Sequence, residues 1–253
     1  MGVGDMRFTV SMLFLAAVGL GISSHADEGA AGNPADPEPL RTMADAAFQA
    51  QDWPRLEDLA KQYLSLHPHD YRSAIYAGQA EFHMGRLDAA FDSADTARKD
   101  VLAIPDPPPE IRAVIGTIYS IEANIRARQQ RTDDAVALFK ASLSYGGPDP
   151  AQTWMSIAYT QFHSREYGEA IASAEKVMAL DPRIPDPYFL KGMILVTQSP
   201  VGADGKHVTR NGREALEIYL HLAPNGEKAA LAAEALSRVS KSSLAPGAAT
   251  LGP

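Results

Sequence analysis

Residues 154–182 read WMSIAYTQFHSREYGEAIASAEKVMALDP and place large and small apolar residues at a helical spacing. Ala170, Ile171, Ala174, Val177 and Met178 fall at i, i+1, i+4, i+7 and i+8, which puts them on one face of a helix. A single helical hairpin cannot bury such a face by itself. The pattern therefore predicts that a neighbouring hairpin covers it.

The same pattern recurs along the chain at a regular spacing. The residues that open the second helix of each repeat are Leu56, Ala90, Ala135, Ala170 and Ala215, and the steps between them are 34, 45, 35 and 45 residues. The first long step contains the proline run at 104–109, which cannot continue a helix. We therefore expect insertions near residues 102–110 and 199–210. Within the second insertion, Asp204-Gly205 lies between Val201 and Val208 and favours a tight turn, with a short two-stranded ribbon as one interpretation.

These residues resemble the tetratricopeptide repeat family over residues 38–241. The resemblance implies an all-α fold, a right-handed superhelical solenoid of about five antiparallel helix hairpins plus a C-terminal capping helix. The cap is expected at residues 227–239, with Leu231, Ala235 and Val239 on its buried face. Residues 27–37 are expected to form a flexible linker and residues 242–253 a disordered tail.

The first 26 residues have the pattern of a secretory signal peptide. Residues 8–22 read FTVSMLFLAAVGLGI, and Ser24-His25-Ala26 places small residues at the cleavage positions. The apolar run is shorter than the roughly 20 residues that a membrane span needs, so cleavage after Ala26 is favoured over a retained anchor. Because Asp5 offsets Arg7, translation from Met6 is an alternative to Met1. The expected location is the periplasm of a bacterial envelope or the medium.

The composition narrows the classes of function. The 253 residues are 45% hydrophobic, contain no cysteine and carry a formal net charge of −8. This charge disfavours a nucleic-acid partner. The absence of cysteine excludes disulfides, thiolate metal sites and cysteine nucleophiles. The sequence has neither HExxH nor GxSxG, and His67-Pro68-His69 lacks further ligands at motif spacing. We therefore expect no catalytic site, no metal and no cofactor.

In the family that this chain resembles, the first helices of successive hairpins line a concave groove. The resemblance implies partner-binding positions along these helices, rich in the aromatic and arginine side chains that protein interfaces favour. A Phe-His pair recurs among them two hairpins apart. An alternative is that Phe82 and Phe162 pack between hairpins while the histidines are solvated. The candidate residues are Phe48, Arg72, Gln79, Phe82, His83, Asn124, Arg128, Tyr159, Phe162, His163 and Phe189.

Some relatives grip acidic carboxyl tails with lysine and asparagine, but here the corresponding first-hairpin positions are Arg41 and Asp45, which disfavours that clamp. The sequence thus predicts an exported, non-catalytic scaffold or adaptor that binds a peptide or helix of a protein partner. The alternative is a binding subunit for a small molecule or glycan, or an accessory subunit of an envelope enzyme complex. In that alternative, Tyr159, Phe162, His163 and the loop 201–209 would form a pocket.

Overall fold

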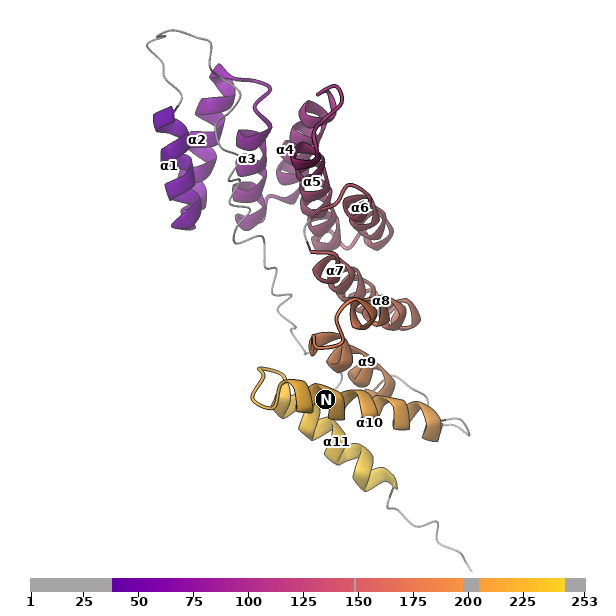
Figure 1. Cartoon of the computed structure of the whole chain (residues 1–253). Coiled ribbons are helices and arrows are strands. Elements are labelled where there is room, and N and C mark those ends of the chain that lie inside the picture. Colours follow the sequence, from indigo (N-terminus) through magenta and orange to yellow (C-terminus); the bar gives the residue numbers. More distant parts are fainter. Residues whose placement is uncertain (1–37, 148, 198–204, 244–253) are drawn as a thin grey trace, which may run out of the picture. The chain divides into compact units, whose positions relative to one another are not determined.

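A computed structural model describes residues 38–147, 149–197 and 205–243, and these residues form helices without any strand. Ten of the eleven helices pair as five hairpins, and the last helix follows them (Figure 1). The all-α helical repeat fold expected from the sequence is confirmed. The helices are α1 (Glu38–Gln49), α2 (Trp53–Leu66), α3 (Tyr71–His83), α4 (Leu87–Leu102), α5 (Pro109–Arg128), α6 (Thr132–Ser144), α7 (Pro150–His163), α8 (Tyr167–Leu180), α9 (Asp186–Thr197), α10 (Gly205–Leu222) and α11 (Ala229–Ser243).

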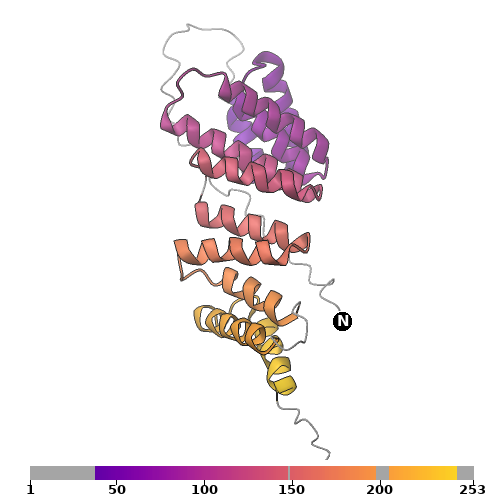
Figure 2. The same cartoon turned by 90° about the vertical axis from the view of Figure 1, so that its right-hand side faces the viewer.

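The helices divide into two compact units, with the division after Gly147. Unit 1 contains α1 to α6, and unit 2 contains α7 to α11. Within each unit every helix packs against the next one along the chain. In unit 2, α11 also touches α9, and Figure 2 shows α9 to α11 next to one another in orange to yellow. The C-terminal helix therefore covers the last hairpin, as a cap does.

Identical turns join the two helices of the first four hairpins. Each turn has one residue with left-handed backbone, namely Gln51 (φ 55°), Gly85 (φ 79°), Gln130 (φ 60°) and Arg165 (φ 64°). After each of them, the next amide donates to the carbonyl five residues back, at 2.8 or 2.9 Å. A left-handed residue followed by such a hydrogen bond is a common C-terminal cap of a helix. The turns are spaced 34, 45 and 35 residues apart, which are the steps that the sequence pattern predicts.

Small residues let the helices of a hairpin approach closely. In unit 1, Ala90, Ala94 and Ala97 of α4 are buried, and so are Ala123 and Ala135. Large side chains fill the space between successive hairpins, and the largest fully buried apolar ones in this unit are Phe82, Phe139, Leu56, Ile115, Ile118 and Ile125. Alternation of small and large residues of this kind allows a densely packed core.

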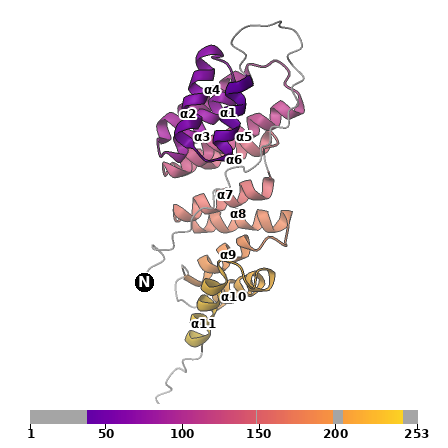
Figure 3. The same cartoon turned by 90° about the vertical axis from the view of Figure 1, so that its left-hand side faces the viewer.

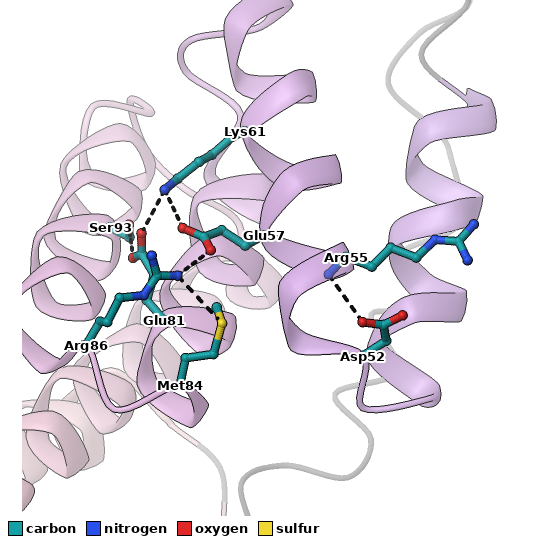
Figure 4. Close-up of polar contacts among 8 residues, drawn as sticks. All are labelled: Asp52, Arg55, Glu57, Lys61, Glu81, Met84, Arg86 and Ser93. Atoms are coloured by element: carbon teal, nitrogen blue, oxygen red, sulfur yellow. Dashed lines mark hydrogen bonds and ion pairs between the residues drawn. The ribbon is translucent and has the colours of Figure 1, made fainter.

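A network of charged side chains joins the first hairpin to the second (Figure 4). Lys61 of α2 pairs with Glu57 of the same helix and with Glu81 of α3, the latter at 3.3 Å. Arg86 pairs with Glu57, and Ser93 of α4 donates to Glu81 at 2.7 Å. Both glutamates are buried, so these partners compensate charges that would otherwise be costly to remove from water.

Three local expectations from the sequence are wrong. Val208 lies in α10, so it does not pair with Val201 in a ribbon, and Val201 itself lies outside the described residues. The insertion therefore partly lengthens a helix at its start. In α11 Ala235 is buried as expected, but Leu231 is exposed and Ala232 is buried in its place, and the side chain of Val239 lies outside the described residues. The helix also continues to Ser243, two residues into the expected tail.

The expected signal peptide and linker, residues 1–37, lie outside the described residues. Among the helices that the structure does describe, none combines the length and the apolar character that crossing a bilayer requires.

Candidate functional site

Unit 1 contains a groove of about 320 Å³ that is lined mainly by its three first helices, α1, α3 and α5. The three helices are labelled in Figure 3. Each contributes residues from one face at helical spacing, and α2 adds Leu59, Ala60 and Tyr63. The side chains from the first helices are Leu40, Arg41, Ala44, Asp45, Phe48 and Gln49 of α1, Arg72, Ser73, Ile75, Tyr76 and Gln79 of α3, and Val114, Thr117 and Ile121 of α5.

Two stacked rings form one wall of the groove. Phe48 of α1 and Tyr76 of α3 lie with their ring centroids 5.5 Å apart and their planes 23° apart. The Tyr76 hydroxyl donates a hydrogen bond to Asp45 at 2.5 Å. Burial raises the pKa of Tyr76, and the bond to Asp45 raises it further. The phenol therefore stays neutral at physiological pH and keeps its proton for this bond, which ties α3 to α1 along the wall.

The charged residues at the groove differ in how they are paired. Arg41 donates to Asp70 at 3.2 Å and lies over the Tyr63 ring, 4.9 Å from its centroid. Asp70 also accepts bonds from the amide and hydroxyl of Ser73, because it caps the start of α3. Arg72, by contrast, forms no ion pair with any carboxylate in the described part of the chain.

Gln79 places an unpaired acceptor in the groove. The residue is only 7% exposed, and its Oε1 atom has no hydrogen-bond partner among the described residues. The Nε atom of Arg41 is likewise buried without an acceptor. Unpaired buried polar atoms are rare and costly in proteins. A bound chain that supplied an N–H group to Gln79 would satisfy this acceptor.

The groove unites only some of the predicted binding residues. Phe48, Arg72 and Gln79 lie there together. Asn124, on the same helix as Thr117, instead donates to the Ser120 carbonyl of its own helix at 2.8 Å. The sequence analysis missed Tyr76 and Tyr63, the second because it belongs to a second helix. Tyr76 could have been found, since it lies one helical turn after Arg72 and one turn before Gln79 on the same face of α3.

The phenylalanines expected in the groove belong to the core. Phe82 is 1% exposed, Phe162 is 8% exposed and Phe189 is fully buried. Phe82 and Phe162 lie near the C-terminal ends of α3 and α7, whereas Phe189 lies near the start of α9, and all three rings pack inside the fold. The expectation that these rings face a ligand is therefore wrong, and the packing alternative is correct for Phe82 and Phe162.

The neighbouring residues His83 and Arg128 form a second cluster outside the groove. The His83 ring stacks on Trp53 with centroids 3.9 Å apart and planes 6° apart. Arg128 lies over the Phe82 ring at 4.9 Å. His163 of unit 2 contacts Phe162 edge-on at 5.7 Å. The two Phe-His pairs thus share a geometry in which the histidine lies beside a buried ring.

Both histidines should make stability depend on pH. Burial lowers the pKa of His83 and of His163, and nearby Arg128 lowers that of His83 further. The folded state thus binds fewer protons than the unfolded state, so the stabilisation is present above the ordinary histidine pKa of about 6.5 and is lost as pH falls through the lower folded value. We expect the melting temperature to fall between pH 7.5 and pH 5, and to fall less in the His83→Gln, His163→Gln double variant. An equal fall in both proteins would contradict this assignment.

In unit 2 the remaining predicted residues have partners within the unit. Tyr159 accepts a hydrogen bond from Lys228 at 3.0 Å and lies 3.5 Å from Asp186. Of the residues expected to form a pocket with the loop 201–209, Tyr159 is bonded to Lys228 and Phe162 is only 8% exposed, and the pocket itself stays a prediction. The loop itself lies outside the described side chains.

The histidines near the end of α2 have separate partners. The His67 ring lies 4.7 Å from the Tyr63 ring, and His69 Nδ1 lies 3.0 Å from an Asp100 oxygen. Within the part of the chain that the structure describes, three or more histidine, aspartate or glutamate side chains nowhere gather in a way that could hold a metal ion.

Comparison with known proteins agrees with the helical repeat fold. The tetratricopeptide repeat family model matches residues 41–101 and 122–183, so the chain contains tetratricopeptide repeats over these two stretches. They comprise most of the first two hairpins and the end of α5 through α8. No protein among those with curated functions matches the chain.

Several solved structures share the fold. YrrB, described as a tetratricopeptide repeat protein with an unusual peptide-binding site, is 13% identical and has a TM-score of 0.58, with 80% of this chain and 94% of that chain covered. MamA from Desulfovibrio magneticus is 13% identical, with a TM-score of 0.57 and coverage of 72% and 94%. A tetratricopeptide repeat protein from Parabacteroides merdae is 12% identical, with a TM-score of 0.59 and coverage of 81% and 72%. At these identities the likeness establishes the fold alone.

Proposed function

We propose that this protein is an exported, non-catalytic adaptor whose groove in unit 1 binds an extended segment of a partner protein. The observation that carries the proposal is the buried, unpaired Oε1 of Gln79 in a groove with an apolar floor and a stacked aromatic wall. An extended chain presents backbone N–H groups to such an acceptor and side chains to the floor. Helical-repeat arrays commonly bind other proteins on this face.

The groove favours an extended segment over a helix. It holds roughly 320 Å³, and a helix, which uses its backbone N–H groups in its own hydrogen bonds, has few to offer the Gln79 acceptor there. An extended chain advances about 3.3 Å per residue and can run along the groove with only alternate side chains inserted. The same volume lies near the lower end of small-molecule pockets, which is what favours a small molecule or glycan as the second candidate.

A peptide selection on the purified chain tests the groove. We expect peptides selected from a random display library to bind the Tyr76→Ala variant at least about tenfold more weakly than the wild type, because Tyr76 supplies half of the aromatic wall. The matched control is Tyr145→Ala, which removes a tyrosine that stacks on Tyr119 with centroids 5.4 Å apart, outside the groove.

Equal binding to wild type and to the Tyr76→Ala variant would exclude the groove as the peptide site. If no peptide is selected and mass spectrometry of the purified chain finds a retained small molecule that Tyr76→Ala loses, the second candidate replaces the adaptor. Export is tested separately, by sequencing the mature amino terminus in the native host. A terminus at Asp27 supports it, and an intact Met1 or Met6 contradicts it.

A further inference from the structure

The connection between α10 and α11 folds back onto unit 2 and ends at Lys228. The Lys228 amide donates to the Tyr219 hydroxyl at 3.2 Å, which fixes the backbone just before α11 begins. Gly226 contributes to this approach, since a Cβ atom there would lie 2.7 Å from the same hydroxyl. The lysine side chain is thereby directed toward α7 and α9, the first helices of the two hairpins in unit 2.

The Lys228 ammonium has three kinds of partner at its end. Its Nζ atom donates to Asp186 Oδ2 at 2.8 Å and to the Tyr159 hydroxyl at 3.0 Å. It also lies 5.6 Å from the centroid of the Tyr159 ring and 5.7 Å from that of Phe189. A carboxylate, a hydroxyl and two ring faces are together the chemistry that recognises a primary ammonium group.

The electrostatics of the site suit a cation. Burial and the neighbouring Asp186 raise the pKa of Tyr159, so its phenol remains protonated at physiological pH. Asp186 is partly exposed, whereas Lys228 is largely buried. Solvent and small solutes can therefore reach the carboxylate from the side that the lysine leaves open.

These residues occupy the positions in unit 2 that form the groove in unit 1. The Phe-His pair of α7 follows that of α3 by 80 residues, and the same shift relates Tyr159 to Gln79. Asp186 precedes Gly192 of α9 by six residues, as Arg72 precedes Gly78 of α3. Since Gln79 and Arg72 line the groove in unit 1, Lys228 lies where a ligand of the corresponding face in unit 2 would lie.

We propose that unit 2 carries a binding site for a primary ammonium group, made by Asp186, Tyr159 and Phe189, which the chain's own Lys228 occupies. A lysine side chain of a partner competes for this site and, on binding, releases the start of α11. The tethered lysine competes at an effective concentration in the millimolar range or above, so an external ammonium group binds the intact chain only weakly. This inference does not depend on the function proposed for the groove in unit 1.

Removing the internal lysine should expose the site to a small probe. We expect n-butylammonium chloride to raise the melting temperature of the Lys228→Ala variant in a saturable way, at concentrations at least about tenfold below any effect on the wild type. The matched control is the Lys228→Ala, Asp186→Asn double variant, which keeps the cavity but loses the carboxylate. n-Butanol, which lacks the charge, should stabilise neither variant.

An equal response of the single and double variants, or no response of a folded Lys228→Ala variant, would overturn the proposal. Should that variant fail to fold, Lys228→Met keeps most of the aliphatic stem, and methylammonium, which needs only the space of the ammonium group, replaces n-butylammonium as the probe. A second measurement uses the wild-type chain, with amide hydrogen exchange in α11 followed during titration with the peptide acetyl-Gly-Lys-Gly-amide. We expect faster exchange with this peptide than with its norleucine counterpart, and identical exchange would exclude the release of α11.

Discussion

Gly116→Ala is expected to destabilise unit 1 by about 2 to 3 kcal/mol, even though alanine favours a helix by about 1 kcal/mol over glycine. Gly116 lies in the middle of α5, where a Cβ atom would stand 2.5 Å from both the Cα and the N of Gly147 and 3.0 Å from the Ser142 carbonyl oxygen. These obstacles are backbone atoms, which cannot rotate away as a side chain could. The turn after α6 would have to move, and the hairpin of α5 and α6 would open.

The two tryptophans allow unit 1 to be followed by itself, because Trp53 belongs to unit 1 and Trp154 to unit 2. Urea unfolding by fluorescence in a Trp154→Phe background reports on unit 1. The control is Gly168→Ala, which changes an exposed glycine of α8 that has nothing within 4 Å of the added Cβ. We expect unchanged or slightly raised stability for this control by circular dichroism. If Gly116→Ala is as stable as the wild type or more stable, the turn after α6 accommodates the added methyl group and the prediction is wrong.

The second large effect is expected at the buried Glu122 of α5. Its carboxylate is fully buried and accepts from Arg98 Nε, which lies 2.8 Å from Oε1 and 3.1 Å from Oε2. Arg98→Met should cost about 3 kcal/mol, because it leaves a buried charge without its partner. Arg131→Met breaks the exposed pair with Asp134 and should cost less than about 1 kcal/mol.

The loss of stability caused by Arg98→Met should be smaller at acidic pH. Burial raises the pKa of Glu122, and Arg98 counteracts that rise, so the variant raises the pKa further. The folded state then binds a proton that the unfolded state releases, and stability is greatest below the ordinary glutamate pKa and is lost as pH rises through the folded value. Urea unfolding at pH 5 and pH 8 should therefore show the larger deficit at pH 8. Adding Glu122→Gln should remove this difference, and a deficit independent of pH would argue against a buried charge as its cause.

The repeat could be predicted from the sequence because one simple rule governs it. Alanines and glycines recur where helices of a hairpin touch, and the left-handed turns at Gln51, Gln130 and Arg165 follow the same spacing even though glycine is absent there. The prediction failed for the capping helix α11, where the repeat period gives no information. The packed face of α11 depends on the angle at which the helix meets α9 and α10, so Ala232 replaced Leu231.

The groove was only partly predictable for a related reason. Helical spacing places Arg72, Ile75 and Gln79 on one face, and all three line the groove. Spacing does not show where a helix leaves the groove, and Phe82, one turn beyond Gln79, already belongs to the core. The contacts of Lys228 were not predictable either, since they join residues 42 and 69 positions apart through a connection with no repeat pattern.

The stacked wall of Phe48 and Tyr76 has a consequence for the strength of binding. The hydroxyl of Tyr76 is already held by Asp45 and its ring stacks on that of Phe48, so an arriving segment does not have to freeze the rotamer of Tyr76. Immobilising a side chain on association costs about 0.5 to 1.5 kcal/mol, and this loss is avoided on the protein's side of the contact. Preorganisation of this kind lets a short stretch of chain bind with useful affinity, with flexibility of the incoming segment as the main entropic cost.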